Sequence, residues 1–440
     1  MNQLRSIIKA KDYLLNLNKK SSIKNNSIFY FATFVGSIGF YIFDRIAKKK
    51  NDFFKNFIMI FKDVFYTYNF TGCEIYFSDK ILNNYDNIYL TWASYSNFKN
   101  DGSLNDKYLN INSKDLVKTL IIAIYKDEKL PLKLNDNIII FQTKKNKIGF
   151  IEIIKNIFKN LNYIIFNYYF FLAKISSHNF FSEILLKKTR FLLNKKIKFF
   201  LTPYEGQPFQ NQFIMQLKKI NKEIKCIGYI HSPPIPIPAN YINKKYSPDF
   251  IILNGKDQKT CFNKFLGWPK SKIKLLPSFR FLKSKKNKKR VIFLPYNIIN
   301  VNKIINSLNY IIENNIINHE EYVIRSHPAI KSRNSEKIIN HFNKLKKKNN
   351  SSNEIKSHFL IFIGNSGGII EYLERGYRVI HILDDDFYDF YSNELWPSII
   401  STKLCNGIYI YKIKKKGNLI KLGDSKKHSI KKIMKFCDKL

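Results

Sequence analysis

The chain has 440 residues, which is too long for one ordinary hydrophobic core and predicts two domains. Hydrophobic residues make up 45% of it and aromatic residues 15%, which excludes a disordered chain. The formal charge is +42, from 75 basic and 33 acidic residues, and it predicts attraction to anions such as nucleotides or an anionic membrane surface.

Two further features limit what this charge implies. The sequence is rich in Lys, Asn and Ile, so a compositional bias without function explains many of the lysines equally well. No zinc-finger spacing, heptad repeat or aromatic RNA-binding motif accompanies the charge, and we expect no specific nucleic acid partner. The 5 cysteines are scattered without a CxxC pair, which indicates a reducing compartment and no structural zinc.

The first long apolar stretch is IFYFATFVGSIGFYIF at 28–43. It carries no charge, contains two glycines and is shorter than a typical membrane-spanning helix. We expect a buried strand, a glycine loop and the start of a helix, with a membrane anchor as the alternative. The residues before it lack the continuous apolar core of a signal peptide, so we expect a cytoplasmic protein.

From about residue 87 onward, short apolar strands alternate with amphipathic segments, the pattern of parallel sheets in an α/β fold. The expected strands are 87–93, 137–142, 197–203, 225–231, 249–255, 272–278, 290–296, 321–327, 358–364 and 377–383, with a helix over 209–224. The charged tract SKKNKK at 284–289 predicts a linker between domains 1–283 and 290–440. The last segment, 424–440, predicts a basic amphipathic helix that could pack back on the first domain.

Ligands of parallel α/β sheets bind beyond the carboxyl ends of the strands, so polar residues that follow a strand are candidates. In the first half these are Glu205 and Gly206, then His231 and Ser232. The Glu205 carboxylate could be a general base for a sugar hydroxyl, or it could complement the dipole of the next helix. His231 and Ser232 could touch substrate or belong to a rigid connection, and Trp92 could stack on a sugar or pack in the core.

The second half has two such places. Arg325 and His327 follow a strand, and a protonated imidazole could bind a phosphate and donate a proton, although most histidines are structural. The stretch IFIGNSGGIIEYLERG places a polar turn before a helix, and its candidate residues are Asn365, Ser366, Gly367, Gly368 and Glu371. Its backbone N–H groups suit a phosphate and Glu371 a ribose hydroxyl, whereas an ordinary helix cap is the alternative.

A metal site has weak support. Asp384, Asp385 and Asp386 form an acidic run after a strand. Such a run could hold a divalent ion, but it is more often a solvated turn. We therefore expect neither a metal nor another cofactor.

Three of these motifs together resemble the bacterial sialyltransferases and related capsule glycosyltransferases of the GT-B fold. The motifs are Glu205-Gly206, His327-Pro328 and the turn at Ser366. The chain departs from that family in having Tyr204 where a second acidic residue is usual and Asn365-Ser366 in place of a Ser/Thr pair. The resemblance implies an α/β, GT-B-like fold of two Rossmann-like domains with parallel sheets facing a central cleft.

The resemblance also implies residue roles. Glu205 would be the base on the acceptor, His327 would support the leaving phosphate, and the Ser366 turn would bind it. The implied enzyme is an inverting, metal-independent glycosyltransferase that moves a sugar, such as a CMP-linked nonulosonate or Kdo-like sugar, to a growing surface polysaccharide. Its partners would be a nucleotide-sugar donor, a glycan or lipid-linked acceptor and the anionic inner face of the cell membrane, where it would be peripheral.

Other classes remain open. The sequence NSGGIIE (365–371) is also similar to a turn in the UDP-GlcNAc 2-epimerases, which share the GT-B fold. The acidic and His-containing motifs of their N-terminal half are not apparent here. An epimerase-like enzyme or a non-catalytic polysaccharide-assembly protein is therefore the alternative prediction.

Overall fold

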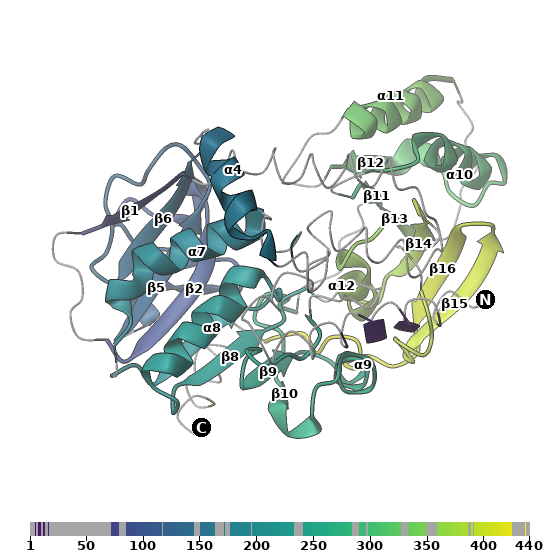
Figure 1. Ribbon diagram of the computed structural model, residues 1–440. Coiled ribbons are helices and arrows are strands. Elements are labelled where there is room, and N and C mark those ends of the chain that lie inside the picture. The colour runs from purple at the N-terminus through teal and green to yellow at the C-terminus, as the bar shows by residue number, and fades with distance from the viewer. Residues whose placement is uncertain are drawn as a thin grey trace.

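The computed structural model describes most of the chain between residues 72 and 424. The described residues are 72–78, 85–116, 118–144, 150–162, 171, 177–194, 196–232, 241–283, 290–295, 298–326, 333–348, 359–385, 389, 391–424 and the single positions 5, 8, 9, 12, 13, 16 and 436. Within them the chain forms two large sheets that lie beside one another, each with helices packed against it (Figure 1).

The first sheet has eight strands in the order β1-β6-β5-β2-β7-β8-β9-β10. Their bounds are β1 Gly72–Phe77, β2 Asn87–Ala93, β5 Thr119–Tyr125, β6 Ile138–Lys144, β7 Phe199–Pro203, β8 Lys225–Tyr229, β9 Phe250–Leu253 and β10 Ile273–Leu275. All neighbours pair in parallel except β1, which runs antiparallel to β6. A small hairpin of β3 (Asn105–Asp106) and β4 (Ile111–Asn112) lies between β2 and β5 in the chain.

Helices cover this sheet because its strands are apolar on both faces. Every residue of β5 is buried, for example. The helices are α4 Phe150–Lys159, α7 Ser177–Thr189, α8 Pro208–Ile220 and α9 Lys256–Leu266, and the first three lie together on one face (Figure 1). Phe209, Phe213 and Leu217 of α8 are spaced by four residues and are buried on one side, where Phe213 stacks on Phe200 of β7 at 5.3 Å.

The second sheet has six strands in the order β12-β11-β13-β14-β16-β15. Their bounds are β11 Arg290–Phe293, β12 Tyr322–Arg325, β13 Phe359–Ile363, β14 Arg378–Ile382, β15 Ile399–Cys405 and β16 Ile408–Ile413, and the helices are α10 Val301–Glu313, α11 Arg333–Lys348 and α12 Gly368–Glu374. The four strands β11 to β14 are parallel, and β16 and β15 extend the sheet in antiparallel fashion.

The two halves share one hydrophobic cluster. It contains Tyr204 and Trp268 from the first half together with Phe362 and Leu373 from the second. The chain also returns to the first half after β16, and we call residues 417–423 the returning segment. Lys421 N donates to Asn254 O at 2.7 Å, and Ser278 N donates to Lys421 O at 2.7 Å. The halves are therefore joined by buried apolar surface and by backbone hydrogen bonds.

The predicted α/β fold with two parallel-rich sheets is confirmed. All ten expected strands are present: β2 has the predicted bounds, β6 ends two residues later than predicted, and the others are shorter than predicted. The sequence patterns did not single out β1, β5, β15 or β16. The stretch 28–43, the linker at 284–289 and most of the C-terminal helix lie outside the described residues, although Phe436 packs edge-on against Phe250 of the first half. The domain bounds and the cleft stay predictions.

Among the described residues, none of the helices combines the length and apolar character needed to span a membrane.

Candidate active site

Glu205 lies at the carboxyl edge of the first sheet, two residues beyond the end of β7. Gly206 after it has φ of +67°, a left-handed conformation that glycine adopts without strain. The amide of Gln210 holds this turn. Its Oε1 accepts from Glu205 N at 3.0 Å and Gln207 N at 3.2 Å, and its Nε2 donates to Pro203 O at 2.8 Å. Gln207 is the residue that precedes α8, so Glu205 does not cap that helix.

His231 and Trp92, two other predicted residues, lie in the same region. His231 Nε2 is 3.6 Å from Glu205 Oε1. The ring of Tyr108 meets the His231 ring edge-on at 4.6 Å and the Trp92 ring at 5.5 Å. The connection that carries Tyr108 is held by Asp106, whose carboxylate accepts from Leu109 N at 2.5 Å. The structure therefore gathers an acid, an imidazole and two aromatic rings at the carboxyl ends of β2, β7 and β8.

Burial sets the protonation of this group. It raises the pKa of Glu205, and a hydrogen bond from Gln207 and the positive charges of Lys126 and Arg280 partly offset the rise. Burial, helped by Arg280, lowers the pKa of His231 to about 3. His231 is thus neutral at physiological pH and does not form an ion pair with Glu205. Its Nδ1 is buried and has no hydrogen-bond partner in the structure described here.

The turn at Ser366 follows β13 at the carboxyl edge of the second sheet. Gly364 opens it with φ of +63°. The neutral ring of His381 holds the turn by a hydrogen bond, in which Nε2 donates to Gly364 O at 2.9 Å. Its Nδ1 accepts from the Tyr411 hydroxyl at 3.1 Å. Ser366 Oγ accepts from Gly368 N at 3.2 Å. This serine hydroxyl therefore acts partly as a helix cap, as the structural alternative predicts.

The remaining predicted residues of this turn differ in exposure. Asn365 is exposed, whereas Gly367 is half-buried and directly precedes α12, which is only seven residues long. Glu371 of α12 forms an ion pair with Arg375 at 2.9 Å, and both side chains are largely buried. Burial raises the pKa of Glu371, and the charges of Arg375 and Arg280 oppose the rise.

Arg280 links the two groups. It follows β10 in a turn held by Ser278, whose Oγ accepts from Phe281 N at 2.9 Å, and by the Tyr229 hydroxyl, which accepts from Phe279 N at 3.1 Å. Its guanidinium is exposed, and its charge acts on Glu205, on His231 and, in the second half, on Glu371. The acid after β7 and the helix after the Ser366 turn therefore lie within the field of one cation.

Three further predicted site residues are His327, Arg325 and Ser232. His327 lies outside the described residues. Arg325 ends β12 and its side chain is exposed. Burial raises the pKa of Tyr372 of α12, and the positive charge of Arg325 opposes this rise. Ser232 is half-buried beside His231 and is the last described residue before the proline cluster.

The acidic run after β14 has a structural use. Asp384 accepts from Ile299 N at 2.6 Å and from Asn300 N at 2.7 Å, at the start of α10. Asp389 accepts from the backbone N–H groups of Asp384 and Asp385 at 2.8 and 3.0 Å. Asp386 lies outside the described residues. Within the described part of the chain no group of three His, Cys, Asp or Glu residues could hold a metal ion.

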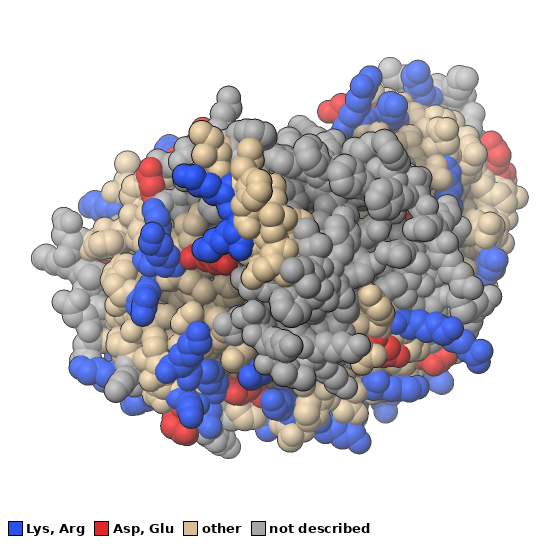
Figure 2. Space-filling view, viewed as in Figure 1, with Lys and Arg blue, Asp and Glu red and all other residues tan. Residues whose placement is uncertain are grey.

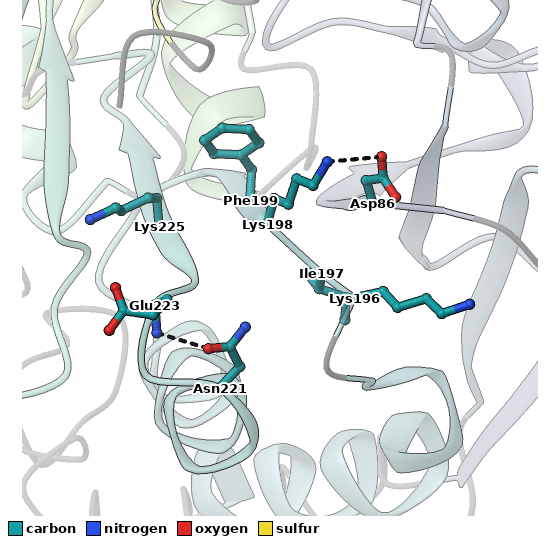
Figure 3. Close-up of a pocket in the computed structure, with 8 residues that line it drawn as sticks. All are labelled: Asp86, Lys196, Ile197, Lys198, Phe199, Asn221, Glu223 and Lys225. Carbon is teal, nitrogen blue, oxygen red and sulfur yellow. Dashed lines mark hydrogen bonds and ion pairs between the residues drawn. The ribbon is translucent and has the colours of Figure 1, made fainter.

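An open hollow of about 540 Å³ lies elsewhere on the first half. Asp86, Lys198 and Lys225 are among the residues that line it, at the amino ends of β2, β7 and β8, and Lys198 pairs with Asp86 at 3.5 Å (Figure 3). Glu205 is at the opposite edge of the same strands. Because parallel sheets bind ligands at the carboxyl edge, we do not place the active site in this hollow.

Sequence reasoning missed Tyr108, Arg280 and His381. Arg280 follows a strand within LLPSFR, so the rule that found Glu205 could also have found it. Tyr108 lies in a long connection, and nothing local marks it. His381 lies within a strand, where its burial and its two partners depend on the neighbouring strands.

The buried His381 predicts a loss of stability in acid. Burial lowers its pKa to about 4, against 6.5 for an ordinary histidine. The unfolded chain therefore binds more protons than the folded chain below pH 6.5, and the free energy of unfolding falls as pH falls from about 6.5 to about 4. We expect a loss of about 2 kcal/mol from this residue. Urea unfolding at pH 7 and pH 4.5 measures it, and His381→Asn should make the decline shallower; an equal decline in the variant would contradict the assignment.

The comparisons with known proteins add little. No protein-family model matches the chain, and no curated protein matches it. Among solved structures, a trehalose 6-phosphate synthase from Burkholderia multivorans is similar with a TM-score of 0.35 and 7% identity, over 66% of this chain and 75% of that one. The apo structure of OtsA has a TM-score of 0.34 and 11% identity, over 66% and 76% of the two chains. Likeness at this level carries no statement on activity, so the function is argued from the site.

Proposed function

We propose that the protein is an inverting, metal-independent glycosyltransferase that moves a sugar from a nucleotide donor to a growing surface polysaccharide. The observation that carries the proposal is Arg280, whose charge acts on Glu205 of the first half and Glu371 of the second. Glu205 follows one parallel sheet, a polar turn follows the other, and the charge of one cation acts on residues of both. This arrangement suits a reaction in which a base and a leaving phosphate flank the transferred sugar.

The residues have separate roles in this proposal. Glu205 removes the proton of the acceptor hydroxyl, and burial makes it a stronger base than an exposed glutamate. Arg280 and Arg325 provide fixed positive charge for the phosphate that departs with the nucleotide. His327 and the turn of Asn365, Ser366 and Gly367 would complete that phosphate site, and Glu371 would accept from the ribose. No metal is needed because these groups balance the charge.

The acceptor side is formed by the first half. His231 is neutral and buried, with Nδ1 unpartnered among the described residues, so it can exchange a hydrogen bond with a sugar hydroxyl. Burial, with the charges of Glu205 and Asp106, raises the pKa of Tyr108 to about 12, so its phenol stays protonated and able to donate. The half-buried Trp92 and Tyr108 present ring surface of the kind on which sugars stack.

A thermal-shift panel of CMP, UDP and GDP tests the proposal. A nucleotide that binds only the folded state raises the melting temperature, and one at about 100 times its Kd stabilises by about 2.7 kcal/mol. We expect one nucleotide to stabilise the protein, and CMP would identify the CMP-linked nonulosonate or Kdo-like donor class. Stabilisation by UDP, together with conversion of UDP-GlcNAc in the absence of an acceptor, would instead identify an epimerase. No shift with any of the three would overturn the proposal.

Replacing Arg280 with methionine sharpens the same test. Loss of one charge-assisted contact to phosphate should weaken binding of the stabilising nucleotide by about tenfold or more. Arg333→Met, at the exposed start of α11, is the matched control and should leave the affinity unchanged. Equal affinities for the two variants would remove Arg280 from the phosphate site.

A further inference from the structure

The helix α4 has an exposed apolar face. Ile151 and Phe158 each have a relative exposure of 67%, which is unusual for large hydrophobic side chains. They are two helical turns apart with the exposed Lys155 between them, and the exposed Lys159 lies beside Phe158. Residues spaced by three or four lie on one side of a helix, so Ile151, Lys155 and Phe158 form a single ridge.

This ridge is separate from the side of α4 that packs on the protein. Ile157 lies about a third of a turn around the helix from Ile151 and contacts the hydrophobic cluster shared by the two halves. Figure 2 shows tan side chains along α4 with blue lysine and arginine side chains beside them. Leu161, just beyond the helix, adds a further apolar side chain with 39% exposure. The helix is therefore apolar on two sides, and among the described residues only one of them packs on the protein.

The lysines indicate what the second side contacts. A protein partner that covered Ile151 and Phe158 would also have to bury the Lys155 ammonium between them, at a large cost in desolvation. A lipid surface removes this conflict, because apolar side chains enter the acyl boundary while lysine stems extend to the headgroup phosphates. The formal charge of +42 complements an anionic bilayer in the same way.

We propose that α4 docks the protein on an anionic lipid bilayer, with Ile151 and Phe158 inserted at the headgroup boundary and Lys155 and Lys159 on the lipid phosphates. Docking needs no sugar transfer, so it can fail or succeed independently of the proposed function. It would hold the first half, which carries Glu205, close to a lipid-linked acceptor.

Co-sedimentation of the full chain with vesicles tests the docking. One set of vesicles is phosphatidylcholine alone, and the other contains about one third phosphatidylglycerol, a mimic of an anionic leaflet. We expect binding to the second set and little to the first. The double variants Ile151→Ser with Phe158→Ser, and Lys155→Gln with Lys159→Gln, should each weaken binding by about tenfold or more. Because all four side chains are exposed, the melting temperatures should not change.

Phe191→Ser is the matched control. Phe191 is 65% exposed in the 3₁₀ turn Arg190–Leu192 after α7, away from α4 in sequence and next to a basic residue. It should bind the anionic vesicles like the unaltered protein. Absence of binding to anionic vesicles, equal binding to both sets, or a loss in Phe191→Ser as large as in the α4 variants would each overturn the proposal.

Discussion

Replacing Glu205 with glutamine is expected to reduce sugar transfer by about 10²–10⁴-fold, the range for loss of a general base. Glutamine keeps the size of the side chain and the hydrogen bond of 3.4 Å from Gln207 Nε2, so the turn before α8 should persist. Binding of the stabilising nucleotide should be unchanged, because the proposed function assigns Glu205 to the acceptor and not to the nucleotide. Steady-state rates with the nucleotide sugar identified by the thermal-shift panel provide the measurement.

The pH profile distinguishes a base from a merely structural residue. Because burial raises the pKa of Glu205 above the ordinary 4.5, kcat/KM should fall in acid at a pH higher than an exposed glutamate would give. Arg280 opposes that rise, so Arg280→Met should move the acidic limb to still higher pH. A limb that stays in place in this variant would mean that another group titrates.

Glu223→Gln is the control for the loss of a carboxylate. Glu223 lies at the amino edge of the same sheet, where it lines the hollow together with Lys198 and Lys225. Its replacement should leave transfer intact. Full activity in Glu205→Gln would remove Glu205 from the role of base, and a comparable loss in Glu223→Gln would move the site to the hollow.

Much of the fold could be predicted from the sequence because parallel strands buried on both faces are apolar runs. The strand at 87–93 was predicted with the bounds that β2 has. The strands β15 and β16 were harder, because β15 carries exposed residues at most positions and shows no continuous apolar run. β15 is the edge strand of this sheet and depends on its pairing with β16 more than on its own pattern.

The candidate site could be predicted only in part, for a related reason. Glu205 and the Ser366 turn follow strands, and position along the chain was enough to single them out. Arg280 also follows a strand, so the same rule could have found it, whereas Tyr108 lies in a long connection and meets His231 only through the tertiary fold. That the charge of Arg280 acts on both Glu205 and Glu371 depends further on how the halves are joined, and residues 417–423 are part of that joint.

The returning segment connects α12 to the first half at several points. The buried carboxylate of Glu374 accepts from Gly417 N and Leu419 N, both at 2.8 Å, and from Ile420 N at 3.1 Å. On the other side of the segment, Gln258 Nε2 of α9 donates to Leu419 O at 2.9 Å. The helix that carries Glu371 is thereby held in a defined place relative to β9, α9 and Arg280.

Gly255 lies against the backbone of the returning segment and leaves no room there for a side chain. A Cβ at this residue would lie 1.9 Å from Leu419 O and 2.4 Å from Asn418 O, which are backbone atoms that cannot rotate away. Its φ of −144° suits any residue, so the effect of Gly255→Ala would be steric alone. We expect the returning segment to be displaced and the free energy of unfolding to fall by about 3 kcal/mol or more, as measured by urea denaturation.

Gly267→Ala separates this steric effect from backbone strain. Gly267 ends α9 with φ of +71°, and a Cβ there meets nothing within 4 Å. Its replacement should cost only about 1 kcal/mol, the conformational penalty of the left-handed region. If Gly255→Ala lowered the free energy of unfolding no more than this control does, the returning segment would be able to move away from the new Cβ without loss of stability. The joint would then not be what holds Glu371 near Arg280, and the shared hydrophobic cluster alone would set the relative position of the two halves.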